Sequence, residues 1–447
     1  MTTPTFCPAA LALTAALVFP HPATATPGRA ARITVPSAAA AADDSTLEVL
    51  PFHPLDEDSL ESGPSRNAGV SFAHDEWLRA PFGDNLLTDP DQWRAADDEA
   101  LRSQLGADYN RVDRIRLSFS HQVQRPETMM PRVATRIEYA FGRERLLYGL
   151  QLEQPIAPPG RLALGVSMVR RTDHSELQQV DDVENSLALL FGRQDYRDYF
   201  EREGFGGYLS WRVPDFSTVS VHLRNDQFRS LPVVWGTRSW FQRDRTLRAN
   251  PSVEEGEAHA AILRLERLAH RTGRTRAGLY HWIELERAGG RLEGDFDYTR
   301  LLGDVRSVMV LTPASSLALR LVGGHAFQGR LPAQKQFTCG GVDGLRAHPF
   351  AKYRGDELAL AQAEYTLGLW RIRTPATEGG LHAIAFVDCG SAWSNPDHAW
   401  DVGRQHIQAD GGFGLATSED EVRVYFARDL QDPGSDFVIS LRLQRPF

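Results

Sequence analysis

The sequence lacks the features that would indicate a soluble enzyme or a helical membrane protein. Beyond its first 25 residues, no apolar run approaches the roughly 18 residues that a transmembrane helix needs. The chain has 3 cysteines and 14 histidines but no zinc-like spacing, no Gly-x-Ser-x-Gly sequence and no phosphate-binding loop. A basic stripe suited to nucleic acid is also missing. We therefore predict that the chain is not an enzyme and uses no metal, cofactor or nucleic-acid partner.

The N-terminal segment has the pattern of an export signal. An apolar run from Pro8 to Phe19 is followed by Ala23-Thr24-Ala25, a small-x-small pattern suited to cleavage, although no basic residue precedes the run. An ordinary N-terminal helix is the alternative, but Pro20 and Pro22 would interrupt it. We predict a signal peptide over residues 1–25 and therefore an exported protein.

Acidic charge is concentrated in one segment of the chain. Between Asp43 and Asp108 there are 16 acidic residues but only 4 arginines and no lysine, whereas the whole chain has a formal net charge of −9. The remainder is therefore nearly neutral. Because the segment 26–110 has few aliphatic runs and many Asp, Pro and Ser residues, it is predicted to be a mostly disordered periplasmic arm. A short helix near Asp89–Gln104 remains an option.

From Arg111 onward, apolar and polar residues alternate in short segments, which is the two-residue period of a strand with unlike faces. Helical spacing is not sustained anywhere in this region. The alternation is clearest at Ile115/Leu117/Phe119, Leu146/Tyr148/Leu150/Leu152, Val219/Val221/Leu223, Leu263/Leu265, Ala277/Leu279/Ile283, Leu317/Leu319/Leu321 and Val422/Val424/Phe426.

The connections between these segments differ in length. Turn signals such as Pro158-Pro159-Gly160 are short, whereas longer polar stretches fall at 228–256 and 327–355. Short turns at one end and long loops at the other are typical of outer-membrane barrels. A soluble β-sandwich would also alternate, but with more even and shorter connections. We predict an all-β fold, a transmembrane antiparallel β-barrel over residues 111–447, monomeric and surrounded by outer-membrane lipid.

The number of strands follows from parity. Both ends of a single-chain bacterial barrel normally lie in the periplasm, which requires an even number of strands. A first count along the chain gives about 15 strands. If the two long loops are both extracellular, the missing strand precedes Phe205. Asn185–Arg193 is the best candidate because Leu187, Leu189 and Phe191 alternate with smaller residues, so the prediction is 16 strands.

The C-terminal segment also alternates, and the chain ends on a phenylalanine. Such a last strand is typical of what outer-membrane proteins present to the assembly machinery. The alternative is a chance phenylalanine on an ordinary edge strand, which in a soluble protein would expose an apolar edge and favour aggregation. The predicted assembly signal comprises Phe437, Ile439, Leu441, Leu443 and Phe447.

The segment Phe337–Phe350 contains a Gly-Gly pair followed by a hydrophobic residue and an arginine. This arrangement resembles the long-loop motif of the BamA/TamA family, the bacterial surface antigens, which are related to two-partner secretion transporters. The motif reads hydrophobic-Arg-Gly-aromatic there, and the resemblance implies a long extracellular loop folded back into the barrel lumen. Ala347 stands where Gly is usual and His348 where an aromatic residue is usual. The motif residues are Gly340, Gly341, Gly344, Leu345, Arg346, Ala347 and His348.

Other segments support this resemblance in the expected order. Glu364 begins a pair that resembles the Glu-aromatic pair after the family's loop, and Phe386, Asp388 and Gly390 resemble its Phe-x-Asp-x-Gly strand. Upstream, Tyr109–Asp113 resembles the entry into the first strand. The resemblance therefore spans the whole barrel.

Strand parity directs two carboxylates into the lumen. Glu364 and Asp388 fall on the faces opposite the apolar residues of their strands. A loop-borne Arg346 inside the barrel would be costly unless it were paired, and the resemblance implies a contact between Arg346 and Asp388. Separate solvation of all three side chains in a wet lumen is the alternative. We favour the Arg346–Asp388 pair, with Glu364 as a second lumenal partner.

Two cysteines, Cys339 and Cys389, lie beside these motifs. The periplasm is oxidising, so a disulfide between them could pin the loop. However, Cys389 has the parity of the lipid-facing residues, so a bridge would require the strand to end or bulge there. Two unpaired cysteines are therefore the preferred interpretation.

The resemblance implies a function without bond chemistry, namely insertion, assembly or translocation of client proteins at the outer membrane. The seam between the first and last strands would open to template an incoming strand. Members of the family carry periplasmic POTRA domains that receive client proteins, but the segment before Arg111 does not show the β-α-α-β-β pattern of such a domain. One alternative is a passive porin-like channel for small solutes. A third class is a surface adhesin, which would need a binding surface on the loop at 228–256.

Overall fold

The computed structural model describes residues 48–50, 101–123, 129–157, 161–213, 217–241, 244, 246–267, 278–373, 378–395, 407–417, 422–432 and 434–443. The predicted signal peptide, most of the predicted arm and Phe447 lie outside the described residues.

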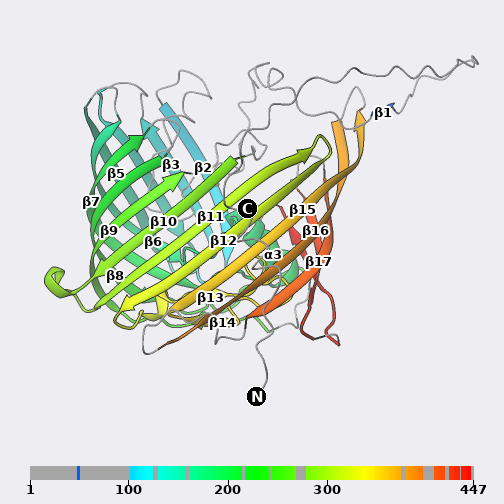
Figure 1. The fold of residues 1–447 in the computed structure, drawn as a ribbon. Helices are drawn as coiled ribbons and strands as arrows, with labels where there is room; N and C mark the ends of the chain where they lie inside the picture. The colour runs from blue at the N-terminus through cyan, green and yellow to red at the C-terminus, as the bar shows by residue number, and fades with distance from the viewer. Residues whose placement is uncertain are drawn as a thin grey trace, which may run out of the picture.

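The described chain forms one large antiparallel β-barrel (Figure 1). Each wall strand pairs antiparallel with the next one along the chain, and β12 pairs with β15 across a long connection. The predicted all-β barrel is therefore confirmed. The wall strands are β2 (Leu101–Asn110), β3 (Arg114–Val123), β4 (Arg132–Ala140), β5 (Arg145–Ala157), β6 (Leu162–His174), β7 (Tyr199–Val213), β8 (Ser217–Ser230), β9 (Gly256–Arg267), β10 (Gly278–Ala288), β11 (Tyr298–Thr312), β12 (Ser315–Gln328), β15 (Glu357–Arg373), β16 (Glu378–Trp393), β17 (Gln408–Thr417), β18 (Arg423–Asp429) and β19 (Val438–Arg442).

Burial alternates along the strands as a barrel wall in lipid requires. In β5, Leu150 and Leu152 are 43% and 44% exposed, whereas Gln151 between them is 1% exposed. The outward side chains are apolar and the lumenal ones are polar or charged, which is the pattern of an outer-membrane barrel. Pairing between neighbouring strands satisfies the backbone groups that lipid cannot hydrogen-bond. The chain is thus built for the bacterial outer membrane.

No helix within the described ranges has both the length and the apolar character needed to cross a membrane.

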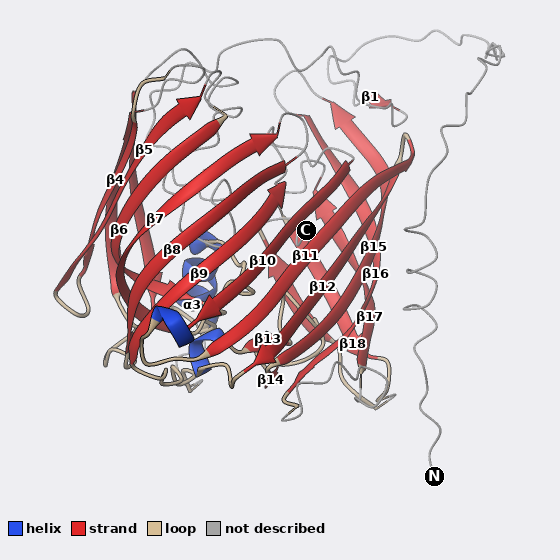
Figure 2. Ribbon diagram, turned by 60° about the vertical axis from the view of Figure 1, so that its left-hand side comes forward, coloured by secondary structure: helices blue, strands red, loops and turns tan. Residues whose placement is uncertain are grey.

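The two ends of the barrel carry different connections. Only Pro313-Ala314 joins β11 to β12, whereas the opposite end carries the connections 175–198, 231–255 and 329–356, gathered at the lower end in Figure 2. This asymmetry assigns the long connections to the extracellular side. The smaller elements on this side are α3 (Asp182–Gly192), η3 (Gly290–Leu292), η4 (Ala333–Lys335), β13 (Phe337–Cys339) and β14 (Tyr353–Gly355).

The wall has the predicted 16 strands, but one of them is not the predicted segment. Among the described residues, the main sheet has 17 strands including β1 (Glu48–Leu50), whose backbone pairs with the end of β15, so β2–β12 and β15–β19 form a wall of 16. The prediction that Asn185–Arg193 is a strand is wrong, because this segment belongs to helix α3 and its C-cap. The remaining strand is β2, which lies in the segment assigned to the arm and ends just before Arg111.

Capping signals explain why this segment is helical. Asp181 accepts a hydrogen bond from the backbone nitrogen of Val183 (Oδ1···N 2.8 Å), and Asp182 and Glu184 place negative charge in the first turn. Arg193 ends the helix in the left-handed conformation with φ 54°. These local features outweigh the strand-like alternation of the leucines.

Strand pairing does not close the wall between its two end strands. β2 pairs with β3 and β19 pairs with β18, but across the residues that the structure describes no pairing joins β19 to β2. Helix α3 packs against β2 instead. Figure 1 shows α3 at the rear of the barrel, between the cyan first strand and the red C-terminal strands.

An apolar cluster occupies the extracellular part of the lumen. Its members include Phe228, Trp282, Tyr298, Phe337 and Leu345, each at most 2% exposed. Two of these side chains come from the long connection 329–356. This connection is therefore packed into the barrel. Burial of each such side chain stabilises the fold by about 1.5–3 kcal/mol.

Candidate functional site

The lumenal loop, residues 329–356, runs from β12 into the barrel and returns to β15. Its two arms pair as a short antiparallel ribbon, in which Phe337 lies opposite Gly355 and Cys339 opposite Tyr353. The tip between the arms carries the Gly-Gly pair and the arginine of the sequence motif. The predicted long loop folded into the lumen is therefore present.

The Gly-Gly pair allows the tip to close on itself. Gly340 and Gly341 have φ values of 117° and 89°, which side chains other than glycine rarely adopt. A Cβ atom on Gly340 would also lie 2.5 Å from the carbonyl oxygen of Pro349. The backbone nitrogen of Gly341 donates to the carbonyl oxygens of Leu345 and His348, each at 3.1 Å.

Arg346 lies against the lumenal faces of β15 and β16. Its Nε and Nη2 donate to Oδ2 and Oδ1 of Asp388 at 2.9 and 3.0 Å, and its Nη1 donates to Oε2 of Glu364 at 3.0 Å. The guanidinium carbon lies 3.9 Å from the ring centroid of Phe386 and 4.7 Å from that of Tyr425. The structure thus brings together the arginine and the two carboxylates that parity directs into the lumen.

Further side chains hold each carboxylate. Glu364 also accepts hydrogen bonds from Arg423 and from the hydroxyl of Tyr425, the latter at 3.1 Å. Gln362 donates to Oδ1 of Asp388 at 3.1 Å and to a backbone carbonyl of the loop tip at 2.9 Å. The loop tip and the wall therefore share one polar network.

Arg346, Glu364 and Asp388 form what we call the Arg346 node, and all three are at most 3% exposed. Burial alone would lower the pKa of Arg346, but Asp388 and Glu364 outweigh it and raise the pKa above its ordinary value. The guanidinium therefore stays charged. Removal of one partner from such a buried pair costs about 3–5 kcal/mol, because it leaves a buried charge unpaired.

The two positions that depart from the family motif make contacts of their own. Ala347 does not have a positive φ, so this backbone conformation requires no glycine. Its backbone nitrogen donates to Oδ2 of Asp410 at 2.7 Å. His348 places Nδ1 2.9 Å from Oδ1 of Asp410 and Nε2 3.6 Å from Oδ2 of Asp429. An imidazole fits here because β17 and β18 supply acidic partners.

The strand motif and the cysteines lie around this network. A Cβ atom on Gly390 would lie 2.6 Å from the carbonyl oxygen of Ala359, so glycine allows β15 and β16 to pair closely. Cys339 and Cys389 are buried thiols with no disulfide between them. Burial, reinforced by nearby carboxylates, raises the pKa of Cys339 to about 12. That thiol therefore stays protonated and unreactive at neutral pH.

The C-terminal strand has the alternation that its sequence predicts. Phe437, Ile439 and Leu441 are 51%, 66% and 55% exposed, whereas Arg442 is 1% exposed. The apolar side chains therefore face lipid and the arginine faces inward. Whether this strand, with Leu443 and the undescribed Phe447, is read as an assembly signal stays a prediction.

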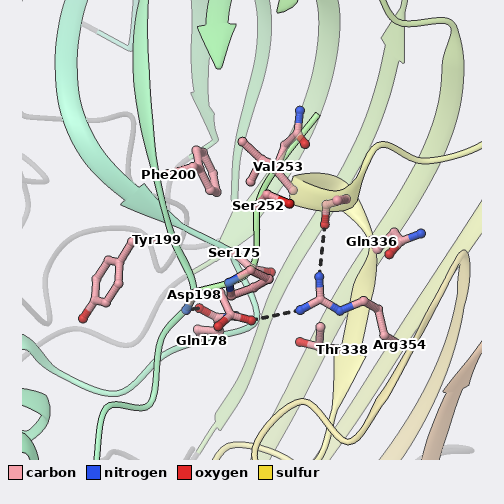
Figure 3. A pocket seen from close by; sticks show the side chains of 13 residues that line it. Ser175, Gln178, Asp198, Tyr199, Phe200, Ser252, Val253, Gln336, Thr338 and Arg354 are labelled. Carbon is pink, nitrogen blue, oxygen red and sulfur yellow. Dashed lines mark hydrogen bonds and ion pairs between the residues drawn. The ribbon is translucent and has the colours of Figure 1, made fainter. Parts of the chain in front are cut away.

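A second ionic cluster joins the long extracellular loops. Oδ1 of Asp198 lies 3.2 Å from Nη2 of Arg111 and 2.5 Å from Nη1 of Arg248, and its Oδ2 lies 2.9 Å from Nη2 of Arg354. Figure 3 shows Arg354 pointing toward Asp198 beside a small pocket lined by Ser175, Gln178 and Thr338. In the part of the chain that the structure describes, no three His, Cys, Asp or Glu side chains are grouped to hold a metal ion. This cluster connects three long loops and the turn between β2 and β3.

Comparison with known proteins identifies the fold. No family model and no curated protein sequence matches the chain. BamA from Haemophilus ducreyi, solved without POTRA domains 1–3, is 11% identical with a TM-score of 0.51, and the match covers 77% of this chain and 71% of that one. CdiB from Acinetobacter baumannii is 14% identical with a TM-score of 0.42, over 77% of this chain and 59% of that one. The barrel thus has the BamA fold.

Sequence reasoning missed several members of the site. Gln362, Asp410, Arg423 and Tyr425 all lie on lumenal faces, alternating with outward residues. Parity could have placed each of them in the lumen. It could not have shown which of these side chains contact one another, because local alternation does not determine the register between strands that are distant in the sequence.

Proposed function

We propose that the chain is a BamA/TamA-type protein that acts in the insertion, assembly or translocation of client proteins at the outer membrane. The Arg346 node carries this proposal. It attaches the tip of a long loop inside the barrel through Asp388 and Glu364, at positions where the sequence resembles the family's motifs. The fold shared with BamA supports it.

The proposed mechanism depends on positioning and involves no bond chemistry. The node stiffens the wall at β15 and β16, whereas β2 and β19 have no pairing with each other among the described residues. A strand edge presents backbone donors and acceptors that can pair with an incoming extended strand. A stiff wall beside such an edge is suited to templating a client strand at the membrane.

Depletion of the protein, followed by quantification of the outer-membrane proteome, tests this function. We expect a subset of barrel or secreted proteins to fall and to recover with the wild-type chain. Arg346→Ala should restore them poorly. Arg330→Ala is the matched control, because that arginine lies in the same loop with a side chain 78% exposed and outside the node. If no client falls and the purified protein gives steady conductance in a planar bilayer, a porin-like channel replaces this proposal.

A further inference from the structure

Helix α3 contacts both end strands of the barrel within one turn. On one side, Oγ of Ser186 accepts a hydrogen bond from the backbone nitrogen of Tyr109 in β2, at 2.8 Å. On the other side, Oε2 of Glu184 accepts one from the backbone nitrogen of Leu443, just after β19, at 3.0 Å. Oε1 of Glu184 also lies 2.6 Å from Nε of Arg442. The helix therefore connects the two end strands, which have no pairing with each other within the described ranges.

These contacts are made at strand edges. Backbone N–H groups of a strand lie near the plane of the sheet and point toward a neighbouring strand. Tyr109 lies opposite Ile115 of β3 on one side of β2, and its N–H is directed to Ser186 on the other side. Helix α3 thus occupies the place beside β2 where another strand would stand.

The arrangement of residues around α3 agrees with this position. At roughly 100° per residue, Ser186 and Glu184 lie on nearly opposite sides of the helix. Val183, Leu187 and Leu190 share the face between them, and none of the three is buried. If β2 and β19 flank the helix, this apolar face points out of the barrel wall.

The opposite face of α3 is covered and partly polar. Asn185 donates to Oδ1 of Asp195 at 3.2 Å and to the hydroxyl of Tyr199 at 2.9 Å, and Leu189 is fully buried. A helix on the surface of a soluble protein buries its apolar face and exposes its polar one. The reversed polarity of α3 is what a wall element with lipid outside requires.

An aromatic cluster lies at the C-terminal end of the helix. Phe191, Trp240 and Phe241 are 38%, 60% and 63% exposed, and the ring of Phe191 lies 5.0 Å from that of Trp240. The hydroxyl of Tyr109, which has outward parity in β2, donates to the carbonyl oxygen of Arg238 at 2.9 Å. The adjoining loop therefore reaches the outer surface, where aromatic residues anchor at the membrane boundary.

We propose that α3 is a removable segment of the barrel wall. It closes the seam between β2 and β19 with its apolar face toward lipid, and it leaves when an extended amphipathic strand of another outer-membrane protein pairs with these two edges. A helix suits this task because it satisfies its own backbone groups, whereas bare strand edges in lipid are costly. The identity of the entering strand rests on the proposed function; the position of α3 does not.

Cysteine labelling of the full chain in lipid vesicles tests the position. Leu187→Cys should react with a membrane-soluble maleimide and resist a charged, water-soluble one. Two variants on β3 calibrate the assay: Leu117→Cys, whose parent side chain is 47% exposed toward lipid, and Ser120→Cys, on the lumenal face. If Leu187→Cys reacts with the charged reagent like Ser120→Cys, or with neither reagent, α3 does not form the wall and the proposal is wrong.

Displacement is tested in the same vesicles with a synthetic peptide of residues 436–447. The control peptide has the same composition without the alternation. The alternating peptide should raise the charged-reagent labelling of Leu187→Cys toward that of Ser120→Cys, and the control peptide should not. Unchanged labelling would overturn the displacement. Because no client is involved, this result is independent of the depletion experiment, and either can fail without the other.

Discussion

Replacement of Arg346 by alanine is expected to detach the lumenal loop from the wall. Glu364 would keep Arg423 and Tyr425 as partners, whereas Asp388 would keep only the neutral Gln362 among the contacts described above. The cost therefore arises mainly at Asp388, a buried carboxylate left without its cation. A loss of about 3–5 kcal/mol in the free energy of unfolding follows.

Two related variants show whether this reasoning is right. Asp388→Asn should cost less, about 1.5–3 kcal/mol, because it removes charge-assisted hydrogen bonds but leaves Arg346 paired with Glu364. Combining Arg346→Glu with Asp388→Arg should recover only part of the unfolding free energy that each single reversal removes. The new glutamate at 346 would pair with the arginine at 388 but would face Glu364, a like charge, at the position of the present 3.0 Å contact.

Heat-modifiable gel mobility across a urea series measures these effects, because a folded barrel and its unfolded chain migrate differently. Arg330→Ala is the control, since it removes an arginine of the same loop whose side chain is 78% exposed. Equal midpoints for Arg346→Ala and Arg330→Ala would refute the node as the main attachment. A double reversal no more stable than either single reversal would show that Arg346 and Asp388 do not act as a pair.

Further predictions concern single loop positions. Cys339, with its pKa near 12, should resist N-ethylmaleimide at pH 8 until the barrel is unfolded, as peptide mass spectrometry can show. Gly340→Ala should lower stability by about 1–3 kcal/mol because of its positive φ, whereas Gly323→Ala, with open space around its Cβ position, should change little. For Glu176, burial opposes ionisation, but two nearby cations outweigh it and hold the pKa at about 2. Because this pKa is lower than in the unfolded chain, ionised Glu176 stabilises the fold above pH 4.5 and the effect is lost as the pH falls through 2. Glu176→Gln should therefore be less stable than wild type in urea at pH 7, and the difference should shrink steadily as the pH falls from 4.5 toward 2.

The barrel could be predicted because its signal is local. Each strand shows its own lipid-facing side through a two-residue period, as in β5 and β19, and no knowledge of partners is needed. The first strand of the wall, Leu101–Asn110, is not predicted from the sequence because it follows an acidic segment and has few apolar residues. Its pairing with β3 places it in the wall.

The segment around α3 shows where local patterns conflict. Leu187, Leu189 and Phe191 fit a strand, whereas Asp181 and Glu184 fit the start of a helix. The contacts of the folded chain agree with the helix, because Glu184 meets the far end of the chain and Asp181 caps the first turn. A local sequence pattern cannot predict contacts with residues that lie so far along the chain.

By itself the sequence determined the outer-membrane barrel, its even strand number and the lumenal direction of Glu364 and Asp388, because side-chain direction in a strand follows from parity alone. Only the tertiary structure decided that Arg346 contacts both carboxylates, that His348 has an acidic partner, and that α3 stands between β2 and β19. Such contacts depend on strand register and on how the barrel closes, and neither is encoded in a local pattern.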